Sequence, residues 1–228
     1  MKEDVLLLHG AIGSAAQLEP LSEALKENYQ VHLLNFPGHG GTLLPEVFSI
    51  PLFAQHVQAY CNQKELQRVN IFGYSMGGYV GMYLAKHYPA MVNKVATLAT
   101  KFEWTESIAA KEIKMLQPEV IEQKLPQFAA TLRQRHAPHD WKEVLTKTAV
   151  MLKGLGKDNE LKSEDYAQVQ CATLIMLGDR DKMVGMDETL SAFKAIPGAQ
   201  LSIMPSTPHP LEGVDMQLLS FLLKRFFC

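Results

Sequence analysis

Six short apolar runs recur along the chain, with longer amphipathic stretches between them. The runs are continuous rather than alternating, which is typical of strands in a parallel sheet that is covered by helices on both faces. They occupy Val5–Leu8, Val31–Asn35, Val69–Phe72, Val95–Ala99, Thr173–Leu177 and Leu201–Met204. The stretches between them have helical character at about 15–32, 52–67, 75–88, 186–196 and 211–227. This alternation of strands and helices predicts an α/β fold with right-handed crossover connections.

The interval between the fourth and fifth runs, from about Lys101 to Gln170, breaks this alternation. Its apolar residues are spaced by three or four, and Pro118, Pro126 and Pro138 interrupt them. A structureless loop of this length is uncommon in a compact domain, so we expect several helices here. We interpret them as a cap at about 101–170, over the carboxyl end of the sheet, within a single domain that spans 1–228. Ordinary packing helices without a role in substrate binding are the alternative.

A short glycine-rich motif directly follows the third run, where residues Gly73–Gly78 read Gly-Tyr-Ser-Met-Gly-Gly. The pattern G-x-S-x-G on a strand-to-helix turn is typical of a nucleophile elbow. Glycines two positions on either side avoid collisions with the neighbouring strand and helix. We therefore expect Ser75 to hold its hydroxyl free of the sheet, as a nucleophile. The motif is short, and its meaning depends on the other segments of a hydrolytic site.

A second glycine-rich turn, His9-Gly10-Ala11-Ile12-Gly13, ends the first run. Its backbone N–H groups are placed to stabilise a developing oxyanion at the carboxyl end of the strand. The N–H of Met76, the residue after the expected nucleophile, is a further donor to the same oxyanion. We interpret His9 as a structural residue that shapes this loop rather than as a catalytic one.

The acid and the base of such a site are expected after the fifth and sixth runs. Asp179 and Asp181 both follow the fifth run, and on chemistry alone either carboxylate could orient an imidazole. His209 lies between two prolines in the loop after the sixth run, a rigid position from which it could act as general base. The chain order Ser, Asp, His is the order of a site built on a nucleophile elbow.

These segments, together with Asn35–Gly40, resemble the α/β-hydrolase superfamily over essentially the whole chain. The resemblance implies that Asp181 rather than Asp179 is the acid, and that the N–H of Ala11 is the second oxyanion donor. It also implies a trimmed sheet of about six parallel strands in the order 2-1-3-4-5-6, with a helical cap inserted after the fourth strand. Two positions depart from the family: Asn35 stands where Asp is frequent, and Tyr79 stands where the related lyases of menaquinone biosynthesis have arginine.

The function expected from this resemblance is ester hydrolysis by acyl transfer, without a metal or a cofactor. Ser75 would attack the carbonyl, His209 would accept the proton, and Asp181 would orient the imidazole. The apolar cap favours a carboxylesterase acting on a small or medium ester. Two alternatives stay open. One is a C–C bond hydrolase or lyase, for which Arg133, Arg135 and Lys142 would form a basic patch on the cap. The other is a non-catalytic ligand-binding protein.

The composition excludes several other classes of function. The net charge of −2 offers no basic surface for a nucleic acid. No stretch approaches the roughly 18 apolar residues of a membrane span, and the acidic N-terminus does not resemble a secretory signal. Three widely spaced cysteines, Cys61, Cys171 and Cys228, argue against a disulfide framework or a zinc site. We therefore expect a cytoplasmic protein whose partner is a small-molecule substrate; the sequence does not determine its oligomeric state.

Overall fold

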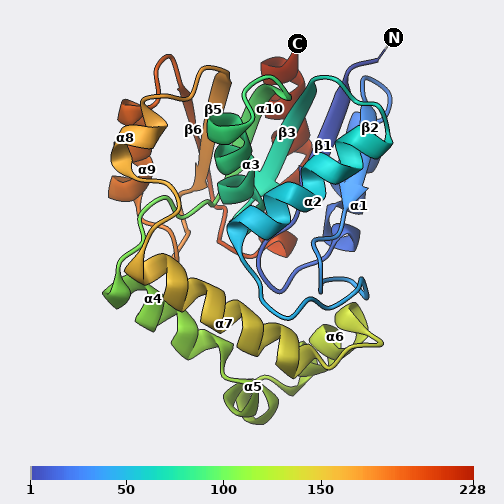
Figure 1. Cartoon of the computed structure of the whole chain (residues 1–228), viewed down its shortest axis with the longest axis vertical. Helices are drawn as coiled ribbons and strands as arrows, with labels where there is room; N and C mark the ends of the chain where they lie inside the picture. The colour runs from blue at the N-terminus through green and yellow to red at the C-terminus, as the bar shows by residue number, and fades with distance from the viewer. Residues whose placement is uncertain (1) are drawn as a thin grey trace.

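The computed structural model describes residues 2–228 and contains one six-stranded parallel sheet (Figure 1). Its strand order is β2-β1-β3-β4-β5-β6, and every neighbouring pair runs parallel. The strands are β1 Asp4–Leu8, β2 Gln30–Leu34, β3 Val69–Tyr74, β4 Val92–Leu98, β5 Ala172–Gly178 and β6 Gln200–Met204. The predicted fold class and strand order are confirmed.

Helices cover both faces of the sheet, which explains why the strands are continuously apolar. They are α1 Glu19–Leu25, α2 Ile50–Gln63, α3 Met76–His87, α9 Met186–Ala195 and α10 Met216–Phe227. One apolar core lies between the sheet and α2, α3 and α9, and a second lies between the sheet and the pair α1 and α10. The two cores fix the strands from both sides, so the loops at their carboxyl ends are held in place.

Two of the predicted helices are shorter in the structure. The first, expected over 15–32, begins as a 3₁₀ turn and ends at Leu25, because the polar segment after it turns into β2 at Gln30. The last, expected from residue 211, begins at Met216. Asp215 caps this helix, since its carboxylate accepts hydrogen bonds from the backbone N–H groups of Gln217 and Leu218.

The long interval between β4 and β5 is helical. It contains α4 Glu106–Ile113, α5 Pro118–Lys124, α6 Pro126–His136, α7 Trp141–Lys157 and α8 Ser163–Tyr166. Pro118 and Pro126 occupy the first position of α5 and α6, where a missing N–H costs no hydrogen bond. Helices α4 to α7 form a layer of their own at one end of the sheet, whereas α8 has returned to pack against α9 (Figure 1).

The layer formed by α4–α7, which we name the cap, has its own small core. Trp141, Leu132 and Leu145 are fully or almost fully buried there, with Ile121 and Ala129. Helices α4 and α7 pack closely against each other at Gly156, where an added Cβ would lie 2.6 Å from Cβ of Ala109. Ile12, from the loop after β1, also contacts the cap core and joins the cap to the sheet.

Candidate active site

Ser75 occupies a sharp turn between β3 and α3. Its backbone has φ of 50° and ψ of −117°, a conformation that residues other than glycine rarely adopt. Two hydrogen bonds hold this turn: the N–H of Ser75 donates to the carbonyl of Leu98 at 2.8 Å, and the Thr100 hydroxyl donates to the Ser75 carbonyl at 3.0 Å. The end of β4 and the residues just after it therefore stabilise the strained conformation that presents the serine side chain.

The glycines around Ser75 allow this close approach. A Cβ on Gly73 would collide with the backbone of Gly77 and Gly78 in the first turn of α3. A Cβ on Gly77 would collide with the carbonyl oxygens of Leu8 and His9 at the end of β1. The steric interpretation of the motif agrees with these contacts: the neighbouring strand and helix leave no room for a side chain at either position.

His209 and Asp181 are hydrogen-bonded to each other at the same end of the sheet. Nδ1 of His209 lies 2.8 Å from Oδ2 of Asp181, and the Asp181 side chain is fully buried. Its other oxygen, Oδ1, accepts from the backbone N–H groups of Met183 and Val184, both at 2.8 Å. Burial alone would raise the pKa of Asp181. The hydrogen bonds from His209 and the two amides outweigh burial and lower it below its usual value.

Asp179, the other carboxylate considered from the sequence, has a different place. It is exposed, accepts a hydrogen bond from the Thr207 N–H at 3.2 Å, and lies 3.9 Å from Nε of Arg180. Of the two aspartates, Asp181 is therefore the one positioned to fix the tautomer of His209. With Nδ1–H donated to Asp181, Nε2 of His209 is left as the proton acceptor.

Tyr74, the residue before the serine, also positions His209. Its hydroxyl donates to the carbonyl of His209 at 2.8 Å and so connects the elbow to the loop after β6. Sequence reasoning did not assign this role. The only available signal was that Tyr74 lies in the motif beside Ser75.

The loop after β1 places Ala11 beside the elbow. In this loop the Gly13 N–H donates to the Gly10 carbonyl at 3.1 Å, and His9 Nδ1 lies 2.8 Å from the same oxygen. The Phe36 N–H donates to His9 Nε2, so His9 is a neutral structural residue. Ala11 and Met76 both line the pocket described next, and among residues 2–228 no hydrogen bond occupies either backbone N–H.

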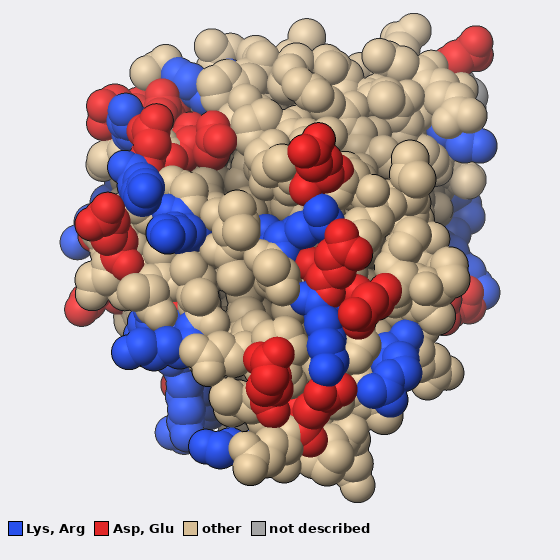
Figure 2. All heavy atoms as spheres, turned by 60° about the horizontal axis from the view of Figure 1, so that its bottom comes forward, with Lys and Arg blue, Asp and Glu red and all other residues tan. Residues whose placement is uncertain are grey.

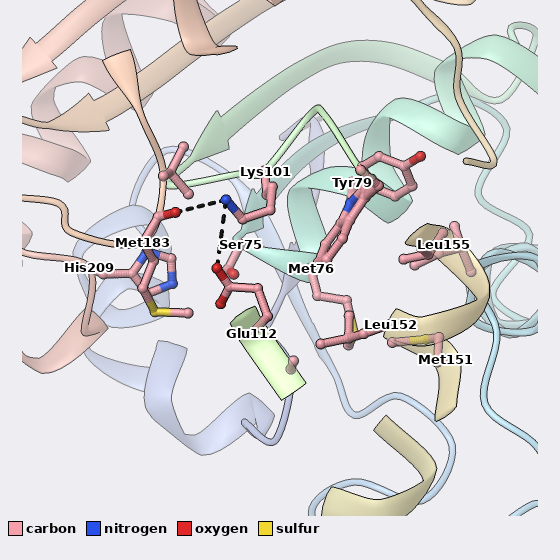
Figure 3. Close-up of a pocket in the computed structure, with 14 residues that line it drawn as sticks. Ser75, Met76, Tyr79, Lys101, Glu112, Met151, Leu152, Leu155, Met183 and His209 are labelled. Atoms are coloured by element: carbon pink, nitrogen blue, oxygen red, sulfur yellow. Dashed lines mark hydrogen bonds and ion pairs between the residues drawn. The ribbon is translucent and has the colours of Figure 1, made fainter. Parts of the chain in front are cut away.

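A pocket between the sheet and the cap brings these segments together. Ser75, Met76, Ala11 and His209 line it from the sheet side, and its cavity volume is about 70 Å³. Figure 3 shows Met151, Leu152 and Leu155 of α7 on one side and His209 and Met183 on the other. The pocket wall is mostly apolar, with Lys101 and Glu112 as its charged members.

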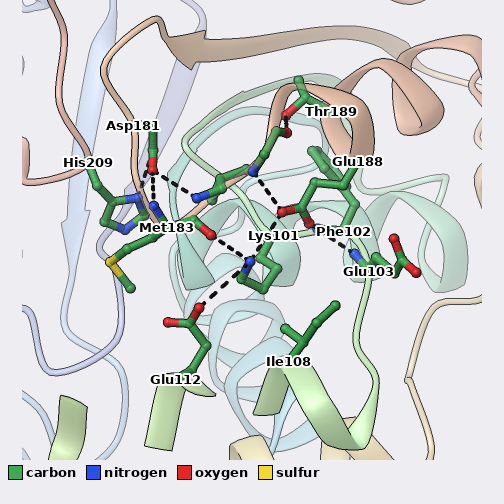
Figure 4. Close-up of polar contacts among 12 residues, drawn as sticks. Lys101, Phe102, Glu103, Ile108, Glu112, Asp181, Met183, Glu188, Thr189 and His209 are labelled. Atoms are coloured by element: carbon green, nitrogen blue, oxygen red, sulfur yellow. Dashed lines mark hydrogen bonds and ion pairs between the residues drawn. The ribbon is translucent and has the colours of Figure 1, made fainter. Parts of the chain in front are cut away.

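Lys101 and Glu188 join the start of the cap to the loop that carries Asp181. Nζ of Lys101 donates to the Met183 carbonyl at 2.7 Å and to Oε1 of Glu188 at 3.1 Å (Figure 4). Glu188 also accepts from the N–H of Gly185 at 2.9 Å and from the N–H of Phe102 at 3.3 Å. Lys101 also lines the pocket. Glu188 was missed, although an acid three residues after a helix start is a capping signal.

Two further observations concern residues 2–228 as a whole. They contain no group of three or more side chains arranged to hold a metal ion. None of their helices combines the length and the apolar character needed to cross a membrane.

Comparisons with known proteins agree with this architecture. The family model described as the alpha/beta hydrolase fold matches residues 5–147. A pimeloyl-[acyl-carrier protein] methyl ester esterase of Aeromonas salmonicida is 26% identical, over 93% of this chain and 93% of that protein. A probable alcohol acetyltransferase of Wickerhamomyces anomalus is 28% identical, over 42% of this chain and only 29% of that protein.

Solved structures show the same fold. The enol-lactonase from Burkholderia xenovorans aligns over 100% of this chain and 92% of its own, with a TM-score of 0.81 and 17% identity. The match to the family model covers well over half of the residues and includes the elbow. The chain therefore belongs to the alpha/beta hydrolase fold family.

Proposed function

We propose that the protein is a serine carboxylesterase that hydrolyses small esters through a covalent acyl-enzyme. The observation that carries the proposal is the hydrogen bond between buried Asp181 and His209, in a pocket that also contains Ser75 on its strained turn. The hydrolase class of the chain agrees with its family and with the names of relatives that are esterases.

In the first half of the reaction, Oγ of Ser75 forms a bond to the carbonyl carbon of the ester while His209 Nε2 takes its proton. Asp181 stabilises the imidazolium, and the N–H groups of Ala11 and Met76 stabilise the oxyanion. The C–O bond to the alcohol then breaks, and His209 returns the proton to the departing oxygen. This leaves the acyl group on Ser75.

In the second half, water replaces the alcohol. His209 takes a proton from the water as its oxygen attacks the acyl carbon, and the resulting tetrahedral intermediate uses the same two N–H donors. Collapse breaks the bond to Ser75, the proton returns to Oγ, and the carboxylic acid leaves. No metal or redox group enters either half.

The pocket supports a short acyl group. Its cavity volume is small, about 70 Å³. The side chains of Met151, Leu152 and Leu155 close it on the cap side. A long acyl chain would have to displace these residues, so small esters are favoured over lipids.

The alternative of C–C bond chemistry on an anionic substrate has less support. It would use a basic patch of Arg133, Arg135 and Lys142, and none of the three lines the pocket. Arg133 and Lys142 instead pair with Glu122 on the outer side of the cap. Figure 2 is turned so that the cap end of the molecule comes forward, and it shows basic and acidic side chains interspersed on that side.

A matched pair of aspartate variants tests the proposed mechanism. Hydrolysis of p-nitrophenyl butyrate should fall by about 10²- to 10⁴-fold in Asp181→Asn, because the imidazole loses its orienting partner. In Asp179→Asn it should stay within about threefold of wild type, since that exposed carboxylate does not contact His209. Equal losses in both variants, or no turnover by the folded wild type, would contradict the proposal.

A further inference from the structure

Glu112 is a largely buried carboxylate that faces the pocket and, among residues 2–228, accepts no hydrogen bond. It lies on cap helix α4, is 4% exposed, and lines the cavity together with Ser75 and His209. Figure 3 shows its carboxylate directed toward Ser75 and Lys101. Among residues 2–228, no hydrogen bond reaches either of its carboxylate oxygens; the nearest cation, Nζ of Lys101, is 3.8 Å away.

Such a group needs an explanation, because a buried carboxylate is costly unless it is both paired and hydrogen-bonded, and Glu112 has only a long ion pair. Lys101 supplies only part of the compensation. Its ammonium already donates to the Met183 carbonyl and to Glu188. Burial raises the pKa of Glu112, against the opposing effect of Lys101. The Glu112 carboxylate can therefore accept a hydrogen bond from a group inside the pocket, where a substrate would bind.

The charges around the pocket limit which substrates are compatible with this carboxylate. Lys101 is the one cation lining the described cavity, and it is shared between Glu112 and Glu188. Asp181 adds a further buried negative charge close by. A substrate carboxylate near Glu112 would meet like charge in a site with little water, whereas a hydroxyl or ammonium group would bring the missing donor.

We infer that Glu112 is a specificity-determining residue, which accepts a hydrogen bond from a hydroxyl or ammonium group of the substrate and disfavours substrates that carry a carboxylate there. The substrates expected are small neutral or cationic esters with such a donor within a few bonds of the ester carbonyl. This inference rests on the proposed ester hydrolysis and specifies its substrate class.

Two matched series of substrates test it, one for each half of the ester. In the acyl series, ethyl butyrate, ethyl 3-hydroxypropanoate and monoethyl succinate end in methyl, hydroxyl and carboxylate groups. In the alcohol series, propyl acetate, ethylene glycol monoacetate and acetylglycolate end in the same three groups on the alcohol side of the ester. The value of kcat/KM is measured for each by proton release, with wild type, Glu112→Gln and the control Glu119→Gln, which removes an exposed cap carboxylate.

Wild type is expected to prefer the hydroxyl substrate over the carboxylate substrate in at least one series. In Glu112→Gln this ratio should fall by about 10- to 100-fold, the usual effect of a hydrogen bond to a charged group. In Glu119→Gln it should not change. A second variant, Glu112→Leu, should reverse the order of the hydroxyl and methyl substrates, because it leaves an apolar wall.

Unchanged ratios in folded Glu112→Gln, in both series, would overturn the inference. If that variant does not fold, the kcat/KM values of wild type still test the inference. Equal values for the hydroxyl and carboxylate substrates in both series would also overturn it. These failures differ from failure of the proposed function, in which wild type would hydrolyse neither ethyl butyrate nor p-nitrophenyl butyrate.

Discussion

Three buried histidines predict a steep loss of stability between pH 7 and pH 5. His9, His39 and His136 are all fully buried, and their rings lie in series, with centroids 5.2 Å apart for the first pair and 5.7 Å apart for the second. Burial lowers the pKa of His9 to about 3 and that of His136 to about 4, and it lowers the pKa of His39 well below its usual value. The folded protein therefore holds His9 and His136 neutral at pH 5, and burial opposes protonation of His39 in the same way.

The size of the effect follows from proton linkage. In the unfolded chain each imidazole binds a proton near pH 6.5, whereas in the folded chain it does not until a much lower pH. The stability is present above the unfolded pKa and is lost as the pH falls toward the folded one. Between pH 7 and pH 5 this amounts to about 2 kcal/mol for each of His9 and His136, or about 4 kcal/mol together, and His39 adds a contribution of the same sign. A typical domain has only about 5–15 kcal/mol in total.

Two carboxyl groups of the site act differently in this pH range. The lowered pKa of Asp181 adds no pH dependence here, because its contribution is lost only below the unfolded carboxyl pKa of about 3.9. The raised pKa of Glu112 has the opposite sign to the histidines: the folded state takes up a proton first, which offsets part of the loss.

Urea unfolding followed by circular dichroism at pH 7, 6 and 5 measures this loss directly. The variant His136→Gln should reduce the difference in free energy of unfolding between pH 7 and pH 5 by about 2 kcal/mol. His87→Gln, which removes an exposed imidazole at the end of α3, is the control and should leave the difference unchanged. A wild-type loss below about 2 kcal/mol, or the same loss in His136→Gln as in wild type, would show that the buried histidines do not cause the loss of stability.

Three further predictions concern the turn at Ser75, the loop that carries Asp181, and the pocket. Gly77→Ala should destabilise the fold by about 3 kcal/mol or more and abolish turnover, because its Cβ would collide with β1; thermal melting and esterase assays measure both. Glu188→Gln should lower kcat by about tenfold with little change in KM, since it loosens the Asp181 loop, whereas exposed Glu103→Gln should not. For p-nitrophenyl esters, kcat/KM should fall from butyrate to octanoate, and Met151→Ala should reduce that fall; an equal fall in this variant would contradict the assigned pocket wall.

The sheet was predictable from sequence because its determinants are local. Each strand is a continuous apolar run between turn-forming residues, and a sheet covered on both faces requires such runs. The boundaries were less predictable. The first helix ends at Leu25, and nothing in its apolar spacing distinguishes that end from one several residues later.

The cap illustrates a different limit. Its apolar residues predicted helices correctly, yet Met115 and Leu125 are 47% and 55% exposed whereas Trp141 is buried. A spacing of three or four residues identifies a helix face but does not say whether that face meets another element. The cap bounds of about 101–170 also included α8, which packs beside α9 rather than with the other cap helices.

The proposed catalytic residues stood out in the sequence because their motifs combine unusual backbone demands with chemistry. Gly73 and Gly77 are there to accommodate a strained serine, and such a steric requirement is visible in one short segment. Tyr74, Glu112 and Glu188 gave no comparable signal. Their roles come from contacts with segments far away in the chain, such as the hydrogen bond from Tyr74 to the carbonyl of His209.

Labelling with a fluorophosphonate, followed by intact-mass and peptide analysis, tests whether Ser75 is an activated nucleophile. Wild type should carry one adduct, located on Ser75, and Ser75→Ala that melts at the same temperature should carry none. A folded wild type that remains unlabelled, or equal labelling of Ser75→Ala, would contradict that role of Ser75.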